Sequence, residues 1–169
     1  MTDVKTRIMV RTALFAALTC ISTFIIKIPT PGTGGYIHPG DAMVILSGVF
    51  LGPLYGAAAA GIGSAMADIL GGYFFYAPIT LLIKGITAFV CGRIFRSSSP
   101  TISGERIKCL MCGLFSTIFV AGGYLLFELL IYGRAAIASV PSNLIQGLSG
   151  LVISSLLYAP LKKITKTLA

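Results

Sequence analysis

The chain has 169 residues, of which 56% are hydrophobic and only 11% are charged. This balance is well above the apolar content of a soluble domain and indicates a membrane protein. The formal net charge is +8, but the basic residues are not interleaved with aromatic ones as in a nucleic-acid-binding surface. We therefore attribute the excess charge to orientation in a membrane and expect no nucleic-acid partner.

Ten of the 13 Lys and Arg residues fall into three clusters that are separated by apolar stretches. The clusters are Lys5, Arg7 and Arg11, then Arg93, Arg96, Arg106 and Lys108, and finally Lys162, Lys163 and Lys166. Lys and Arg beside membrane segments stay on the cytoplasmic side. An even number of crossings must therefore separate each cluster from the next, and both termini are predicted to be cytoplasmic.

The first predicted span covers residues 8–28 and is followed by a loop rich in Gly, Pro and Thr over 29–40. Residues 42–67 carry no charge, but Gly52 and Pro53 interrupt them. Proline breaks or kinks a helix, and two crossings in this stretch place all three basic clusters on one side. The sequence therefore predicts a short second helix at about 41–51 and a third helix at about 54–71.

The short helix would measure about 15–17 Å against a hydrocarbon core of about 30 Å. Half-length elements of this kind are tolerated where they pack inside protein or line a polar cavity. An alternative that keeps the same parity is a re-entrant hairpin over 42–67 that makes no crossing.

Three further spans are predicted at 78–95, 108–132 and 141–160, with a cytoplasmic loop over 97–104. The predicted fold is thus a single all-α domain over 1–169, a polytopic membrane protein with six transmembrane helices and a short second helix.

Three ionisable residues lie at membrane depth in this prediction, namely Asp68, Lys84 and Glu128. Each costs about 2.5–3.5 kcal/mol near a helix centre on insertion scales, so each is a functional candidate by default. All three are predicted in the outer half of the bilayer. Adjoining loops and helix starts complete the predicted substrate-binding set with Tyr36, His38, Asp41, Tyr73, Tyr76, Asn143 and Gln146.

The alternative for this set is purely structural. Lys84 could pair with Glu128 or Asp68 and only stabilise packing, and His38 and Asp41 could cap the short helix. Two acids and one base do not cancel, however, and Asn143 with Gln146 adds hydrogen-bonding capacity on one helix face. These features favour a small-molecule pocket.

Small residues recur at four-residue spacing in two of the predicted helices. Gly52, Gly56, Ala60 and Ser64 lead up to Asp68, and this seam is typical of close helix packing. Ala13 and Ala17 form a shorter pair on the first helix. The pair is equally compatible with internal packing and with docking of a partner.

The sequence contains no phosphate-binding loop and no recognisable catalytic set, so we expect neither ATP hydrolysis nor enzymatic activity. Cys109 and Cys112 have metal-like spacing, but further ligands are missing and His38 is predicted on the opposite side. We interpret the four cysteines as buried, inert thiols and expect no metal and no cofactor. A pocket without an energy source suggests a subunit that depends on partner proteins.

These motifs resemble those of the substrate-binding S components of energy-coupling factor (ECF) vitamin transporters, and the resemblance covers nearly the whole chain. It is most specific over 28–41, which contains GGYIHPGD at 34–41. It continues with LGP at 51–53, ADILGGY at 67–73, AP at 77–78 and IKG at 83–85.

The resemblance implies that Ala13 and Ala17 dock a transmembrane coupling subunit, while the 29–40 loop caps the bound vitamin. Two partner ATPase subunits would use the ATP, and the chain would be a multi-pass protein of the bacterial cytoplasmic membrane. The mixed charges, the tyrosines and the absence of Trp favour a pyridoxine- or hydroxymethylpyrimidine-like substrate, with riboflavin next. The rival hypotheses are an integral membrane enzyme using Asp68 and Glu128 as acid and base, or a ligand-free structural protein.

Overall fold

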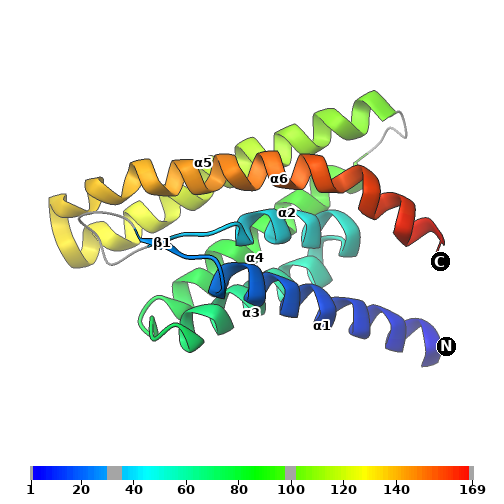
Figure 1. The fold of residues 1–169 in the computed structure, drawn as a ribbon, viewed down its shortest axis with the longest axis horizontal. Helices are drawn as coiled ribbons and strands as arrows, with labels where there is room; N and C mark the ends of the chain where they lie inside the picture. The colour runs from blue at the N-terminus through cyan, green and yellow to red at the C-terminus, as the bar shows by residue number, and fades with distance from the viewer. Residues whose placement is uncertain (1, 30–35, 98–101, 168–169) are drawn as a thin grey trace.

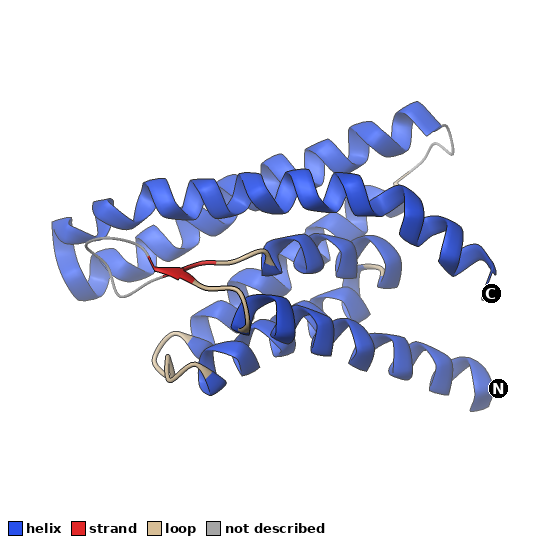
Figure 2. Cartoon of the chain, in the orientation of Figure 1, coloured by secondary structure: helices blue, strands red, loops and turns tan. Residues whose placement is uncertain are grey.

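A computed structural model describes residues 2–29, 36–97 and 102–167 and shows an all-α fold. Its helices are α1 (Thr2–Phe24), α2 (Gly40–Leu51), α3 (Pro53–Leu70), α4 (Ala77–Arg96), α5 (Ile102–Tyr132) and α6 (Val140–Thr167), with a 3-10 helix η1 (Gly133–Ser139) between the last two. Two short strands, β1 (Ile28–Pro29) and β2 (Tyr36–Ile37), pair antiparallel (Figure 2). The rest of the predicted loops, at 30–35 and 98–101, lies outside the described residues.

The short helix α2 forms the centre of the bundle (Figure 1). It contacts each of the other five α-helices, and nine of its twelve residues are buried. The long antiparallel pair α5 and α6 lies on one side of it, and α1, α3 and α4 lie on the other. The half-length helix is therefore enclosed by protein, which is the situation that makes so short an apolar element tolerable in a membrane.

The predicted break between the second and third helices is confirmed at Gly52 and Pro53. Gly52 has a φ of 81°, in the left-handed region that favours glycine, and Pro53 begins α3 at a position where proline fits. Beyond the break, a side chain at Gly56 would meet the backbone of Ser47 and Gly48. The small-residue seam of α3 thus packs internally against α2, as predicted.

Four helix ends differ by several residues from the bounds of the predicted spans, and one of them is the start of α1 at Thr2, six residues before the predicted start at 8. The first helix ends at Phe24 rather than at 28, because the chain then becomes extended and enters the β1–β2 pair. The fifth helix begins at Ile102, six residues before its predicted start. The sixth continues through Pro160 to Thr167. Only one backbone donor is lost at that proline, and the helix tolerates the loss.

The surface of the molecule is apolar, as expected for a membrane protein. Leu54, Leu130 and Leu156 are among the many large hydrophobic side chains exposed, whereas Thr19 and Thr87 are fully buried. Among the described residues, three stretches are long and apolar enough to cross a membrane: Asp3–Phe24, Ala77–Arg96 and Gly104–Ile164, the last of which contains most of α5 and α6.

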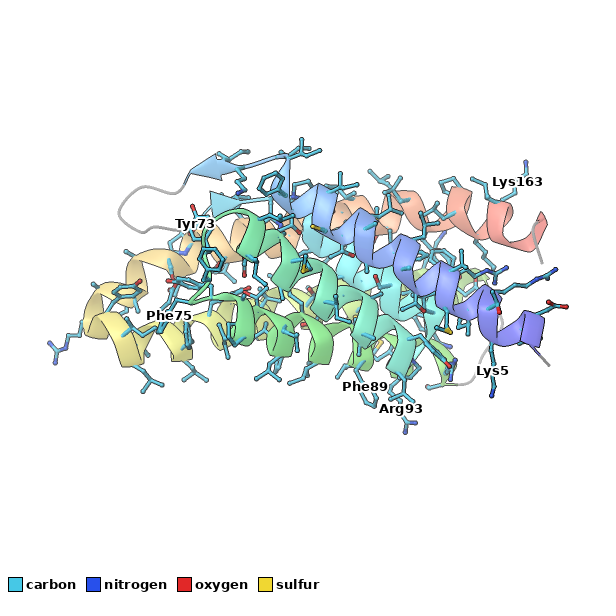
Figure 3. All side chains as sticks on the ribbon, turned by 90° about the horizontal axis from the view of Figure 1, so that it is seen from below. Lys5, Tyr73, Phe75, Phe89, Arg93 and Lys163 are labelled. Carbon is cyan, nitrogen blue, oxygen red and sulfur yellow. The ribbon has the colours of Figure 1, made fainter. Side chains whose placement is uncertain are left out.

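The two termini lie at the same end of the bundle (Figure 1). Lys5, Arg93 and Lys163, one from each basic cluster, also lie at this end, whereas Tyr73 and Phe75 lie at the other (Figure 3). We call the first the basic end. Its existence agrees with the even number of crossings that the charge pattern requires between clusters.

Candidate functional site

A buried ion pair joins α2 to α4 in the interior of the bundle. The Lys84 Nζ donates a hydrogen bond to Asp41 Oδ1, and the exposed fractions of the two side chains are 1% and 0%. The Gln146 Nε2 of α6 donates to the other carboxylate oxygen of Asp41 at 3.2 Å. Three predicted site residues from three helices therefore meet at one carboxylate. The structural alternative paired Lys84 with Glu128 or Asp68, whereas Lys84 pairs with Asp41, which faces inward from the first turn of α2.

His38 lies beside this ion pair, just before α2. Its Nδ1 accepts a hydrogen bond from the backbone N–H of Gly40 at 3.1 Å. Burial lowers the pKa of His38 to about 4, aided by the nearby charges of Lys84 and Lys27 and opposed by Asp41. A neutral imidazole is what the acceptor role of Nδ1 requires. The capping alternative thus fits His38 but not Asp41, whose carboxylate binds side chains instead.

A second polar cluster surrounds Glu128 on α5. Its carboxylate accepts hydrogen bonds from the Ser139 hydroxyl and from the Tyr76 hydroxyl, the latter at 3.3 Å. The Tyr76 and Tyr132 hydroxyls are 3.5 Å apart. Burial, together with the Tyr132 hydroxyl and the charge of Glu128, raises the pKa of Tyr76. Glu128 is buried and, within the described part of the chain, forms no ion pair.

Tyr124 lies between the two clusters and was missed by the sequence analysis. Its hydroxyl is hydrogen-bonded to Thr80 at 2.9 Å, and the Lys84 Nζ lies 5.5 Å from the centre of its ring. The ring centres of Tyr124 and Tyr76 are 6.5 Å apart. The sequence feature that could have identified Tyr124 is its spacing, because it precedes Glu128 by four residues and so shares the same face of α5. Ser139, Tyr132 and Thr80 were also missed.

The other predicted residues lie around these clusters. Asp68 is buried near the end of α3, and its backbone oxygen accepts the N–H of Tyr73 at 2.8 Å. The Lys27 Nζ lies 5.5 Å from the centre of the Tyr73 ring. Asn143 is half-buried one turn before Gln146 and makes no side-chain hydrogen bond to a described residue. Only the backbone of Tyr36, in β2, is described.

Three of the four cysteines are buried inside the bundle. The thiols of Cys91 on α4 and Cys112 on α5 each point to the other's backbone oxygen, at 3.8 and 3.7 Å. Cys109 is also buried, and Cys20 is half-buried on α1. No group of three or more His, Cys, Asp or Glu suited to a metal ion occurs among the residues that the structure describes.

Ala13 and Ala17 are both exposed on α1. The contact of α1 with α3 is made on another side of the helix, where a side chain at Gly63 would lie 2.4 Å from the backbone oxygen of Ala16. The alanine pair is thus part of the outer surface of this chain. Because both side chains are small, the pair forms a flat strip, one helical turn long, among larger exposed residues such as Val10 and Leu14.

Comparison with known proteins gives one family and two informative relatives. Residues 3–163 match the family described as ECF-type riboflavin transporter, S component. A protein of Pyrococcus woesei, described as "Uncharacterized protein in gap 3'region", is 35% identical over 144 residues, which cover 85% of this chain and 93% of that protein. The thiamine precursor transporter HmpT of Lactococcus lactis subsp. cremoris (strain MG1363) is 29% identical over 147 residues, covering 86% of this chain and 81% of that one.

Proposed function

The chain belongs to the ECF-type riboflavin transporter S component family, and on that premise we propose how this transport subunit holds its vitamin-type substrate. The site is the polar interior formed by the Asp41–Lys84–Gln146 cluster and the Glu128 cluster. It is lined by Tyr76 and Tyr124 and bordered by His38, Asp68, Tyr73 and Asn143. The β1–β2 segment, with Tyr36, would cover it.

One observation carries the substrate proposal: Glu128 is a buried carboxylate whose hydrogen-bond partners among the described residues are all neutral hydroxyls. A buried charge is unfavourable unless it is paired. A ligand that offers N–H donors or a positive charge would supply charge-assisted hydrogen bonds, which are about twice as strong as neutral ones. An aminopyrimidine or a pyridoxine-like ring can offer such an N–H donor or positive charge, and its flat ring can lie against Tyr76 and Tyr124.

We therefore favour a hydroxymethylpyrimidine- or pyridoxine-like substrate, with riboflavin next. The name of the HmpT relative, a thiamine precursor transporter, supports the first of these. The test is isothermal titration of the detergent-purified subunit with hydroxymethylpyrimidine, pyridoxine, thiamine and riboflavin, without ATP. We expect submicromolar binding of one of the first two. A folded protein that binds none of the four would contradict the proposed function.

The membrane orientation follows from the basic end. Positive residues beside membrane segments remain cytoplasmic, so we propose six crossings, cytoplasmic termini and a site that opens to the outside of a bacterial cytoplasmic membrane. Single cysteines replacing Lys5 and Arg134, in a background without the native cysteines, test this. An impermeant external thiol reagent should label position 134 and not position 5 in intact cells. Equal labelling of both would refute the topology.

The energy for release would come from partners. We propose that the exposed Ala13 and Ala17 strip contacts a transmembrane coupling subunit, which joins the chain to two ATPase subunits. Small side chains allow a close approach of two helix backbones in lipid. On this proposal ATP is used by the partners alone, and the chain itself catalyses no reaction and needs no cofactor.

A further inference from the structure

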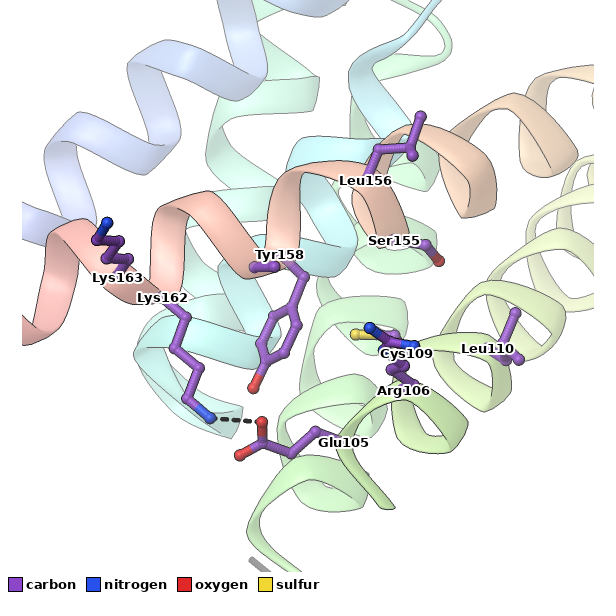
Figure 4. A pocket seen from close by; sticks show the side chains of 10 residues that line it. Glu105, Arg106, Cys109, Leu110, Ser155, Leu156, Tyr158, Lys162 and Lys163 are labelled. Atoms are coloured by element: carbon purple, nitrogen blue, oxygen red, sulfur yellow. Dashed lines mark hydrogen bonds and ion pairs between the residues drawn. The ribbon is translucent and has the colours of Figure 1, made fainter. Parts of the chain in front are cut away.

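A cavity lies far from the proposed substrate site, between α5 and α6 near the basic end (Figure 4). Its volume is about 660 Å³. Arg106, Lys162 and Lys163 contribute to its lining, together with Leu110 and Leu156. We call it the α5–α6 groove. Nothing in the proposed transport function requires it.

The charged part of the groove is positive. The Lys162 Nζ pairs with the carboxylate of Glu105 (Figure 4), and it also lies 5.8 Å from the centre of the Tyr158 ring. Three cationic side chains and one carboxylate line the groove, which leaves a charge of +2. Arg106 and Lys163 are both exposed, so these two side chains can be reached from outside the bundle.

The polarity of the groove changes along the helix axes. Leu110 follows Arg106 by one turn of α5, about 6 Å farther from the basic end. Leu156 precedes Lys162 on α6 by six residues, about 9 Å in the same direction. Both leucines are substantially exposed, at 48% and 71%. The cationic end of the groove therefore lies nearer the basic end of the bundle, and apolar rims flank the groove toward the middle of the bundle.

We propose that the α5–α6 groove binds one anionic phospholipid of the cytoplasmic leaflet. Its phosphate would lie beside Arg106 on α5, with Lys163 adding positive charge from the opposite rim on α6, and the first part of an acyl chain would lie between Leu110 and Leu156 (Figure 4). Basic pockets between transmembrane helices on the cytoplasmic side recognise anionic head groups. A soluble phosphate compound would satisfy the cations but leave the two leucines uncovered, so the arrangement favours a lipid over a free anion.

Native mass spectrometry of the detergent-purified protein tests the proposal. The probes are phosphatidylglycerol and phosphatidylcholine with identical acyl chains, and sn-glycerol 3-phosphate. We expect one phosphatidylglycerol per chain, with apparent affinity at least about tenfold above that of phosphatidylcholine. Arg106→Gln/Lys163→Gln should remove this preference. Lys5→Gln/Arg93→Gln is the matched control, since it removes two exposed charges from the same end, outside the groove, and should retain the preference.

An uncharged variant separates a shaped site from general charge attraction. Ala159 lines the groove, so Ala159→Trp should fill it and abolish the phosphatidylglycerol adduct while the net charge is unchanged. Size-exclusion chromatography and thermal unfolding establish that each variant is folded. Equal retention of the two lipids, equal loss in the matched control, or binding of glycerol phosphate as tight as that of the lipid would overturn the proposal. So would a groove variant that keeps the lipid but no longer assembles with the coupling subunit, because the groove would then be a protein interface.

Discussion

Replacing Lys84 by methionine removes the positive end of the buried ion pair while keeping most of the apolar volume of the side chain. Asp41 would remain fully buried, with the Gln146 amide as a remaining donor at 3.2 Å. Removing one partner of a buried pair costs about 3–5 kcal/mol, because the other charge stays buried without compensation. We expect Lys84→Met to lower the free energy of unfolding by about 3 kcal/mol or more.

A double-mutant cycle tests whether this loss belongs to the pair. Asp41→Asn/Lys84→Met removes both charges at nearly constant volume, and replacing a whole buried ion pair is often neutral. The double variant should therefore lose less stability than the two single variants together, with a coupling energy of about 1–3 kcal/mol. Unfolding in mixed detergent micelles, followed by circular dichroism, supplies the free energies.

The matched control is Lys5→Met, which removes an exposed charge at the basic end and should change stability by no more than about 0.5 kcal/mol. A Lys84→Met variant as stable as this control, or purely additive effects of the two single variants, would refute a stabilising pair. Titration of the folded double variant with substrate then shows whether the pair also contacts the ligand. Undiminished affinity would assign it to packing alone.

Three further outcomes are expected. Glu128→Gln keeps the size of the side chain and removes its charge, so substrate affinity measured by titration should fall about tenfold to a hundredfold; unchanged affinity would show that the ligand does not meet this carboxylate. Ala13→Trp/Ala17→Trp should abolish co-purification with the coupling subunit and stop uptake while leaving substrate affinity within about twofold, whereas loss of binding as well would point to a packing role. The lowered pKa of His38, about 4 against an ordinary 6.5, means that the unfolded chain takes up a proton between these values and the folded chain does not. The contribution of neutral His38 to the free energy of unfolding is thus complete above pH 6.5 and is lost as the pH falls toward 4. Between pH 7 and pH 4 the free energy of unfolding of the wild type should fall by about 3 kcal/mol more than that of His38→Asn. Parallel curves of unfolding free energy against pH for the two proteins would contradict the assignment.

The features of the fold that were predictable have local signals in the sequence. Gly52 and Pro53 mark the break between α2 and α3 because one supplies a positive φ and the other cannot continue a helix. The basic clusters indicate which helix ends lie together because charge is excluded from the membrane interior. Neither inference needs knowledge of how the helices cross.

The partners of the buried charges were not predictable in the same way. Asp41, at the first turn of a helix, has the sequence signature of a cap, and only the central position of α2 turns its carboxylate toward Lys84 on α4 and Gln146 on α6. Such a meeting depends on the rotation of three helices about their axes. Sequence spacing fixes which residues share a face of one helix, but not which face of the next helix it meets.

Tyr124 shows how the stability of this interior and its use for binding are linked. Its hydroxyl is hydrogen-bonded to Thr80, its ring lies 5.5 Å from the Lys84 ammonium, and its ring centre is 6.5 Å from that of Tyr76, which donates to Glu128. A flat ligand placed against this ring and Glu128 would therefore adjoin the ion pair that joins α2 to α4. A cation near an aromatic ring is stabilised most where water is excluded, and the Lys84 ammonium, at 1% exposure, is already shielded; a ligand that holds the Tyr124 ring in place would therefore preserve the Lys84–Tyr124 contact. Substrate binding and the packing of the central helix would then support each other.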